Sequence, residues 1–193
     1  MPRLRKLSRK FYDVPSIELA PALLGTTLVH RLEDGRELRA RIVETEAYCG
    51  TQDLASHASK GRTARTEVMF GQAGRAYVYL IYGMYQMLNV VAGKTQPGEA
   101  EAVLIRAAEP LDDWDADLSG PGKLAREMQI TRTYNTIDLT GGVLFFLERT
   151  GSPHIVKTPR VGVDYAKHWK DELLRFCDAD SDAVSKPRPP KPN

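Results

Sequence analysis

Apolar and polar residues alternate along several stretches of the chain, with the period of two that marks a half-buried β-strand. Segment 26–48 predicts two strands joined at Asp34-Gly35, because this residue pair is typical of a tight hairpin turn. Segment 75–91 predicts a second hairpin, whose strands break near Gly83, a residue that can take a positive φ. Three further strands are expected at 102–111, 142–151 and 154–163.

Helix signals stand between these strands. Residues 16–25 predict a helix with Ser16 as its N-cap, although Pro21 inside the segment weakens the pattern. Residues 119–130 open a second helix, whereas 164–176 fit neither period clearly. Antiparallel hairpins mixed with a few helices predict an α+β fold rather than a doubly wound parallel sheet.

The length of 193 residues suits one domain. We therefore expect a single compact domain with a mostly antiparallel, curved β-sheet, flanking helices and a protruding β-hairpin. Residues 11–179 form the expected folded domain. Residues 1–10 are expected to be a flexible basic arm, and residues 180–193 a flexible tail rich in Pro and Lys.

Two carboxylates interrupt an apolar strand face. Alternation places Glu44 and Glu46 on the same side as Ala40 and Ile42, where a charge is costly unless it is paired or used. A bulge near Val43 would reverse the register and expose both glutamates to solvent. The strand pattern alone favours solvated glutamates, and it leaves a functional site open.

A second strand repeats the anomaly with the opposite charge. Segment 102–111 is apolar on both faces except at Arg106, as expected of a central strand. An arginine buried there needs an anion. A structural salt bridge to Glu44 or Glu46 and a catalytic pairing both satisfy that need.

Aromatic residues give a third signal. Four tyrosines fall within 77–85, which is typical of a strand core but also provides flat surfaces for stacking bases. Tyr82 lies at the expected turn, where an exposed aromatic suits insertion between base pairs. His57 lies in a loop, and a lone loop histidine is more often without a special role.

Composition narrows the function classes. The two cysteines and four histidines form no cluster at metal-binding spacing, so neither a metal site nor a disulfide framework is predicted. The chain has no Gly-rich phosphate loop, so no nucleotide cofactor is expected. It has no predicted signal peptide or transmembrane segment, and we expect a cytoplasmic (nucleoid-associated) or nuclear protein.

Charge is uneven along the chain. The first ten residues hold five basic side chains and no acid, and 60–75 holds four basic side chains against Glu67. Such segments suit a polyanion such as nucleic acid. Charged termini also keep tails solvated, so charge alone does not decide between these interpretations.

Six short segments occur in an order that matches a known family. Together they resemble the alkyladenine (3-methyladenine) DNA glycosylase family of base-excision repair, from about Phe11 to Phe176. The segments are IVETEAY, DLASHAS, MFGQAGRAYVYLIYGMYQMLNVV, AVLIRAAEPL, SGPGKL and PRVGVDYA.

The resemblance implies an activity and assigns residues to it. Members flip a damaged purine out of duplex DNA and hydrolyse its N-glycosidic bond. Glu46 would be the general base that activates water, and Arg106 would help to hold that water. Three residues would line the pocket and stack on the base, namely Tyr48, His57 and Tyr79. Tyr82 would be the wedge that fills the gap in the duplex.

Other assignments follow from the same resemblance. Met84 falls near the wedge, whereas Asn89, Val103 and Leu104 fall near the pocket or its floor. Two residues would contact the DNA backbone, Arg65 and Lys123. The implied protein is a monomer that acts on double-stranded DNA containing damaged purines, with no cofactor.

The implied enzyme is monofunctional, because no lysine stands where a Schiff base would form. A non-catalytic damaged-DNA binding module on the same scaffold is the alternative, and Glu46 distinguishes the two because a binder does not need it. A third interpretation is a small-molecule hydrolase, and the exposed Tyr82 argues against it. The choice among 3-methyladenine, 7-methylguanine, hypoxanthine and ethenoadenine stays open.

Overall fold

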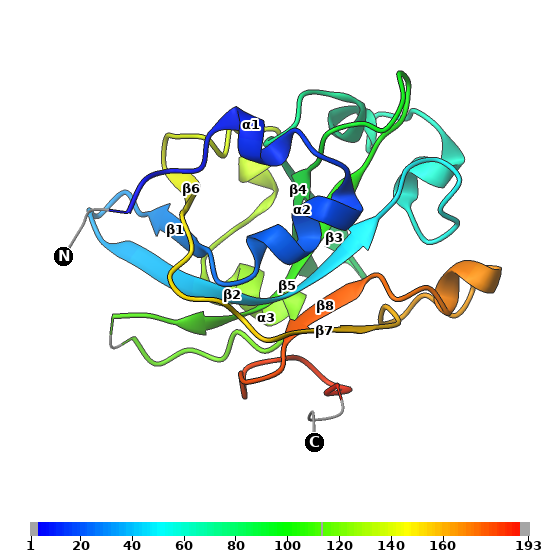
Figure 1. Ribbon diagram of the computed structural model, residues 1–193. Coiled ribbons are helices and arrows are strands. Elements are labelled where there is room, and N and C mark those ends of the chain that lie inside the picture. The colour runs from blue at the N-terminus through cyan, green and yellow to red at the C-terminus, as the bar shows by residue number, and fades with distance from the viewer. Residues whose placement is uncertain (1–3, 113, 190–193) are drawn as a thin grey trace.

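The longest strand, β2 (Glu37–Tyr48), organises the sheet by pairing with three other strands. Figure 1 shows the fold as a computed structural model, which describes residues 4–112 and 114–189. One edge of β2 pairs with β5 (Ala102–Pro110). The other edge is shared, because β1 (Thr27–Arg31) covers its beginning and β8 (Arg175–Asp178) covers its end.

The remaining strands extend this centre into a curled, half-barrel sheet. They are β3 (Ala76–Ile81), β4 (Tyr85–Val91), β6 (Leu144–Leu147) and β7 (Ile155–Thr158). The strand order is β3-β4-β5-β2-β1-β6, and β7 joins through β8 as a separate hairpin. Every pairing is antiparallel, which confirms the expected α+β fold with a curved antiparallel sheet.

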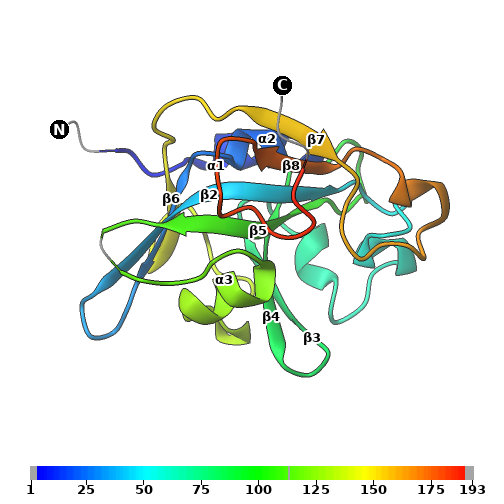
Figure 2. The same cartoon turned by 90° about the horizontal axis from the view of Figure 1, so that it is seen from below.

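Both predicted hairpin turns form where the sequence places them. β1 and β2 are joined across Asp34-Gly35, and β3 and β4 across Tyr82-Gly83. Figure 2 shows the β3–β4 hairpin extending away from the sheet beside α3 (Pro121–Glu127). The protruding hairpin of the prediction is therefore present.

Helices are short and cover the sheet locally. They are α1 (Arg9–Tyr12), α2 (Ser16–Leu23), α3 and the 3₁₀ turns His57–Lys60, Glu67–Phe70, Arg132–Tyr134 and Lys167–Lys170. Ser16 is the first residue of α2 rather than its cap, and its N–H and hydroxyl both donate to the carboxylate of Glu101. Glu101 thereby satisfies a donor of the first turn. The ambiguous segment 164–176 divides into the last 3₁₀ turn and the start of β8.

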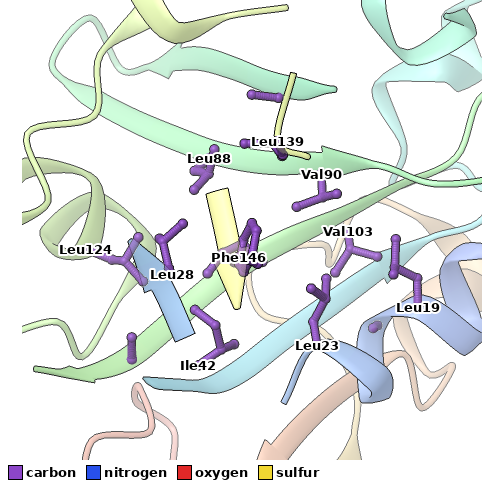
Figure 3. Packing of buried hydrophobic residues seen from close by; sticks show 14 of the residues in the cluster. Leu19, Leu23, Leu28, Ile42, Leu88, Val90, Val103, Leu124, Leu139 and Phe146 are labelled. Atoms are coloured by element: carbon purple, nitrogen blue, oxygen red, sulfur yellow. The ribbon is translucent and has the colours of Figure 1, made fainter. Parts of the chain in front are cut away.

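The core fills the inside of the curl. Figure 3 shows α2 contributing Leu19 and Leu23, and α3 contributing Leu124, to the same cluster as strand residues such as Phe146. Burying a side chain of this size stabilises the fold by about 1.5–3 kcal/mol, which is why such short helices dock firmly. No helix in residues 4–112 or 114–189 is long and apolar enough to cross a membrane.

The structure places parts of both expected tails against the folded domain. Leu7 is buried, and its N–H donates to the carbonyl of Phe146 at 2.9 Å. At the other end, Val184 and Ser185 are buried against the sheet. A few apolar residues within a charged segment are thus enough to hold that segment against the sheet. Residues 1–3 and 190–193 lie outside the described chain.

A bulge in β2 sets the direction of its carboxylates. Ile42 pairs with Ala108, Glu44 with Ala107 and Thr45 with Ile105, so the register shifts on both sides of Glu44. Beyond the bulge the Thr45 hydroxyl donates to α2, and Glu44 and Glu46 point away from the main core. Both are nevertheless fully buried, since β8 and residues 181–185 cover them. The bulge that would have exposed the two glutamates is present, yet both side chains are buried rather than solvated.

Candidate active site

Glu46 is fully buried near the end of β2, with a partner for each carboxylate oxygen. Its Oε1 accepts the backbone N–H of Val161 at 2.8 Å. Its Oε2 accepts the hydroxyl of Tyr48 at 3.0 Å and lies 3.4 Å from Nη1 of Arg106. These donors and the adjacent positive charge offset the cost of burying a carboxylate.

Arg106 reaches both glutamates from the neighbouring strand β5. Its Nε donates to Oε1 of Glu44 at 2.8 Å, while Nη1 points to Glu46. Glu44 also accepts Nε of Arg175 at 2.7 Å. Burial raises the pKa of Glu44, but Arg106 and Arg175 outweigh it and the pKa is lowered. One arginine therefore contacts both carboxylates, so a salt bridge to Glu44 and a pairing with Glu46 occur together.

A cavity of about 180 Å³ opens beside these groups. Seven residues predicted for the site line it: Tyr48, His57, Tyr79, Tyr82, Asn89, Leu104 and Arg106. Glu46 is not among the lining residues, although its three partners Tyr48, Arg106 and Val161 are. The carboxylate thus lies directly behind one wall of the cavity.

Aromatic rings form another part of the wall. Nδ1 of His57 lies 2.9 Å from the Tyr77 hydroxyl, and its ring meets Tyr79 edge to face at 4.6 Å between centroids. Arg65 lies over the Tyr79 ring at 4.9 Å. Burial, together with the charges of Arg65 and Lys60, lowers the pKa of His57 to about 4. The imidazole is therefore neutral at physiological pH, and it can stack on or bond to a base without carrying charge.

Tyr48 is held by a buried ion pair. The guanidinium of Arg160 lies 4.8 Å from the Tyr48 ring centroid and makes two bonds to Asp53, at 2.6 and 2.9 Å. Burial, then the negative charge of Glu46, raises the pKa of the Tyr48 phenol well above its usual value. The phenol therefore stays protonated and donates to Glu46.

The hairpin tip stands at the cavity mouth. Tyr82 is 83% exposed, and its φ of 51° is unusual for a residue with a bulky side chain. Met84 is 67% exposed but does not line the cavity. A strained, exposed tyrosine contributes little to folding, which makes a role in contacting a partner the better explanation.

The other predicted residues divide into two groups. Asn89 lines the cavity and is buried, and its amide donates to the carbonyl of Tyr77 at 3.1 Å. Val103 packs in the core, as Figure 3 shows, and does not line the cavity, whereas the next residue along β5, Leu104, does. The structure thus places Val103 away from the cavity, and its substrate contact stays a prediction. Lys123 lies outside the cavity and pairs with Asp117 at 2.6 Å.

Comparison with known proteins agrees with this arrangement. The profile described as Methylpurine-DNA glycosylase matches residues 10–182. This chain belongs to the methylpurine-DNA glycosylase family. The match covers nearly all of the folded chain and confirms the resemblance that the six sequence segments indicated.

Relatives of this glycosylase family member are similar along almost their whole length. A protein of Legionella pneumophila (strain Corby) is 50% identical over 187 residues, covering 95% of this chain and 100% of the relative. A Methanocella arvoryzae protein is 49% identical, with 95% and 97% covered, and a Myxococcus xanthus protein is 47% identical, with 95% of each covered. All three carry the name "Putative 3-methyladenine DNA glycosylase".

Several residues of this glycosylase site were not identified from sequence. Segment 161–165 lines the cavity through Val161, Gly162, Val163 and Tyr165, and it supplies the N–H that binds Glu46. The sequence predicted a strand here, but β7 ends at Thr158 and the chain continues as a loop. The Asp53–Arg160 pair has no signal in the sequence, because residues so far apart in sequence share no periodic pattern.

Metal ligands do not gather around the glycosylase cavity. Across residues 4–112 and 114–189, no group of three or more His, Cys, Asp or Glu side chains could hold a metal ion. The polar groups beside the cavity instead include a carboxylate, a guanidinium, phenols, an imidazole and an amide. Such groups suit proton transfer and the stabilisation of charge.

Proposed function

We propose that the protein is a 3-methyladenine DNA glycosylase of base-excision repair, which flips the damaged purine into the cavity and hydrolyses its N-glycosidic bond. Family membership supports the reaction class. The observation that carries the mechanism is the contact of Glu46 with Arg106 and Tyr48 at the wall of an aromatic cavity. One chain supplies every residue invoked, so the proposed enzyme acts as a monomer.

In the proposed reaction Glu46 takes a proton from a water molecule whose oxygen attacks C1′ of the flipped nucleotide. The C1′–O bond forms as the C1′–N bond breaks, and the electron pair of the broken bond leaves with the base. The sugar passes through an oxocarbenium-like state that a nearby carboxylate stabilises. Arg106, 3.4 Å from Glu46, would hold the water beside it.

The flipped purine would lie against the rings of Tyr48, His57 and Tyr79. Stacking on aromatic rings contributes about 1–3 kcal/mol per base and does not require a particular base. His57 would also offer its backbone N–H to the purine edge. Tyr82, at the exposed tip, would occupy the gap left in the duplex, with Met84 beside it.

The lining of the cavity favours lesions whose base can leave without first being protonated. Its described residues include no Asp, Glu or Lys, and His57 is neutral at physiological pH. A neutral base such as hypoxanthine needs a proton donor to leave readily, whereas an alkylated purine is already cationic. We expect 3-methyladenine and 7-methylguanine to be released faster than hypoxanthine.

A panel of duplexes, each with a single lesion, tests the proposal. The purified protein is incubated with each duplex, and the released base is measured by chromatography against an undamaged control. Release of alkylated purines with an abasic product supports the glycosylase. Tight binding to the lesion without release would instead favour the damaged-DNA binding module.

The same panel tests whether the enzyme is monofunctional. A lyase forms a Schiff base between an amine and C1′, and borohydride traps it as a covalent complex. Because no lysine lines the described cavity, we expect no trapped complex. A borohydride-dependent protein–DNA adduct would contradict this part of the proposal.

A further inference from the structure

We propose that Ser185, in the C-terminal segment 181–185, is a positioning residue that aims Arg106 at Glu46. This inference rests on the proposed function, because it assigns Arg106 to the reaction. Ser185 lies beyond residues 10–182, where the family match ends.

Two hydrogen bonds and one ion pair hold the guanidinium of Arg106. Nε donates to Glu44 at 2.8 Å, Nη2 donates to Oγ of Ser185 at 3.2 Å, and Nη1 lies 3.4 Å from Glu46. A planar guanidinium held at two of its nitrogens has its third nitrogen placed by geometry. Ser185 and Glu44 together therefore determine where Nη1 points.

Ser185 also completes the environment of Glu44. Its N–H donates to Oε2 of Glu44 at 2.7 Å, and its hydroxyl donates to Oε1 at 2.9 Å. Its carbonyl accepts Nη2 of Arg175 at 2.9 Å. One hydroxyl thus donates to Glu44 and accepts from Arg106, so removing it disturbs both partners of the salt bridge.

The rest of the segment holds Ser185 in place without contacting the site. Val184 packs in a small cluster with Val43, Ala107 and Cys177. The hydroxyl of Ser181 donates to Glu109. The segment is therefore anchored independently of the bond that Ser185 makes to Arg106, and the two contributions can be separated by mutation.

The test compares Ser185→Ala with Ser181→Ala in the full chain. Each change removes one buried hydroxyl from the same segment, but only the first hydroxyl contacts Arg106. The measurements are the single-turnover rate of 3-methyladenine release, the Kd for lesion DNA and the Tm. We expect Ser185→Ala to lower the rate about tenfold with the Kd nearly unchanged, and Ser181→Ala to leave both unchanged.

Two further variants separate positioning from folding. Ser185→Thr keeps the hydroxyl and is expected to retain most of the rate, whereas Ser185→Cys keeps the volume and is expected to lose it. In an Arg106→Ala background the effect of Ser185→Ala should disappear, because the group that it positions is gone. Additive losses in that background would overturn the inference.

Other results would also overturn it. They are an unchanged rate for Ser185→Ala, an equal loss for Ser181→Ala, or a rate loss that follows Tm across all the variants. The unchanged chain is measured in the same series. If it releases no base, the proposed function fails, whereas an active parent with a fully active Ser185→Ala refutes the role of Ser185 alone.

Discussion

Glu44 and Glu46 stand two residues apart on one strand, yet their carboxylates have different partners. Glu44 is bonded by two arginines and a serine, and it lies away from the cavity. Glu46 has one N–H, one phenol and the end of Arg106, all of them at the cavity wall. A carboxylate that is saturated with donors is a poor base, so the local contacts favour Glu46 as the group that takes a proton.

His57 gives a prediction that depends on pH. Its folded-state pKa of about 4 lies below the usual 6.5, so between these values the unfolded chain binds a proton that the folded chain does not. Stability contributed by neutral His57 is thus present above about pH 6.5 and falls as the pH drops toward 4. We expect the urea midpoint of the parent to fall more between about pH 7 and pH 5 than that of His57→Gln. Equal losses, or a His57 titration near 6.5 by NMR, would contradict this.

At the residue scale, sequence predicted that Arg106 pairs with Glu44 or Glu46, but not which of its nitrogens reaches which carboxylate. Arg106 on an apolar strand indicated a buried anion, and the structure places two there. Which glutamate receives which nitrogen depends on the bulge and on Ser185, which is 141 residues from Glu44 in sequence. Val103 illustrates the same limit, because neighbouring strand residues face opposite sides and a one-residue difference separates cavity from core.

At the scale of elements, the β3–β4 hairpin has an unfavourable backbone conformation at its tip. Tyr82 and Gly83 both have positive φ, at 51° and 71°, a conformation that suits glycine or asparagine but strains a tyrosine. The hairpin tip thus carries a side chain that disfavours its own turn. The proposed wedge role of the aromatic ring would account for this strain.

The substitution Tyr82→Asn separates the effect of the turn conformation on stability from the effect of the proposed wedge on DNA binding. Asparagine tolerates positive φ, so we expect the Tm to stay equal or to rise slightly. Lesion-duplex affinity should fall about tenfold, because the stacking surface is lost. Tyr85→Asn on the same hairpin, outside the turn and the cavity, is the control for an exposed aromatic. An unchanged Kd for Tyr82→Asn would remove the wedge role.

The hairpin turns could be predicted from the sequence, whereas the segments that cover Glu44 and Glu46 on β2 could not. Asp34-Gly35 and Tyr82-Gly83 each carry local chemistry that specifies a reversal. The burial of Glu44 and Glu46 comes instead from β8 and residues 181–185, which return from the far end of the chain. No local pattern reports such a return, and the charged composition of the tail suggested the opposite.

At the scale of the whole molecule, we expect individual basic side chains to contribute more to DNA binding than the net charge of +2 does. Arg65 lies over Tyr79 at the cavity, and Lys123 is on α3 beside the hairpin. Lys123 is partly neutralised by Asp117 at 2.6 Å, whereas Arg65 has a neutral histidine nitrogen at 3.4 Å. The two residues should therefore differ in what they contribute to a polyanion.

Salt dependence measures that difference. DNA binding releases counterions, so log Kd should rise linearly with log salt. We expect Arg65→Ala to reduce the slope by about one, and Lys123→Ala to reduce it less, because Asp117 already screens Lys123. Arg36→Ala, in the β1–β2 turn and paired with Asp34, should leave the slope unchanged. Identical slopes for all four proteins would argue against these phosphate contacts.

The measurement that tests the central claim most directly is the single-turnover rate of 3-methyladenine release by Glu46→Gln. The amide keeps the size of the side chain and can still accept the N–H of Val161, but it cannot take a proton from water. The account predicts a rate reduced by about a hundredfold or more, with lesion-DNA affinity retained. Release by Glu46→Gln at a rate close to that of the parent would contradict it.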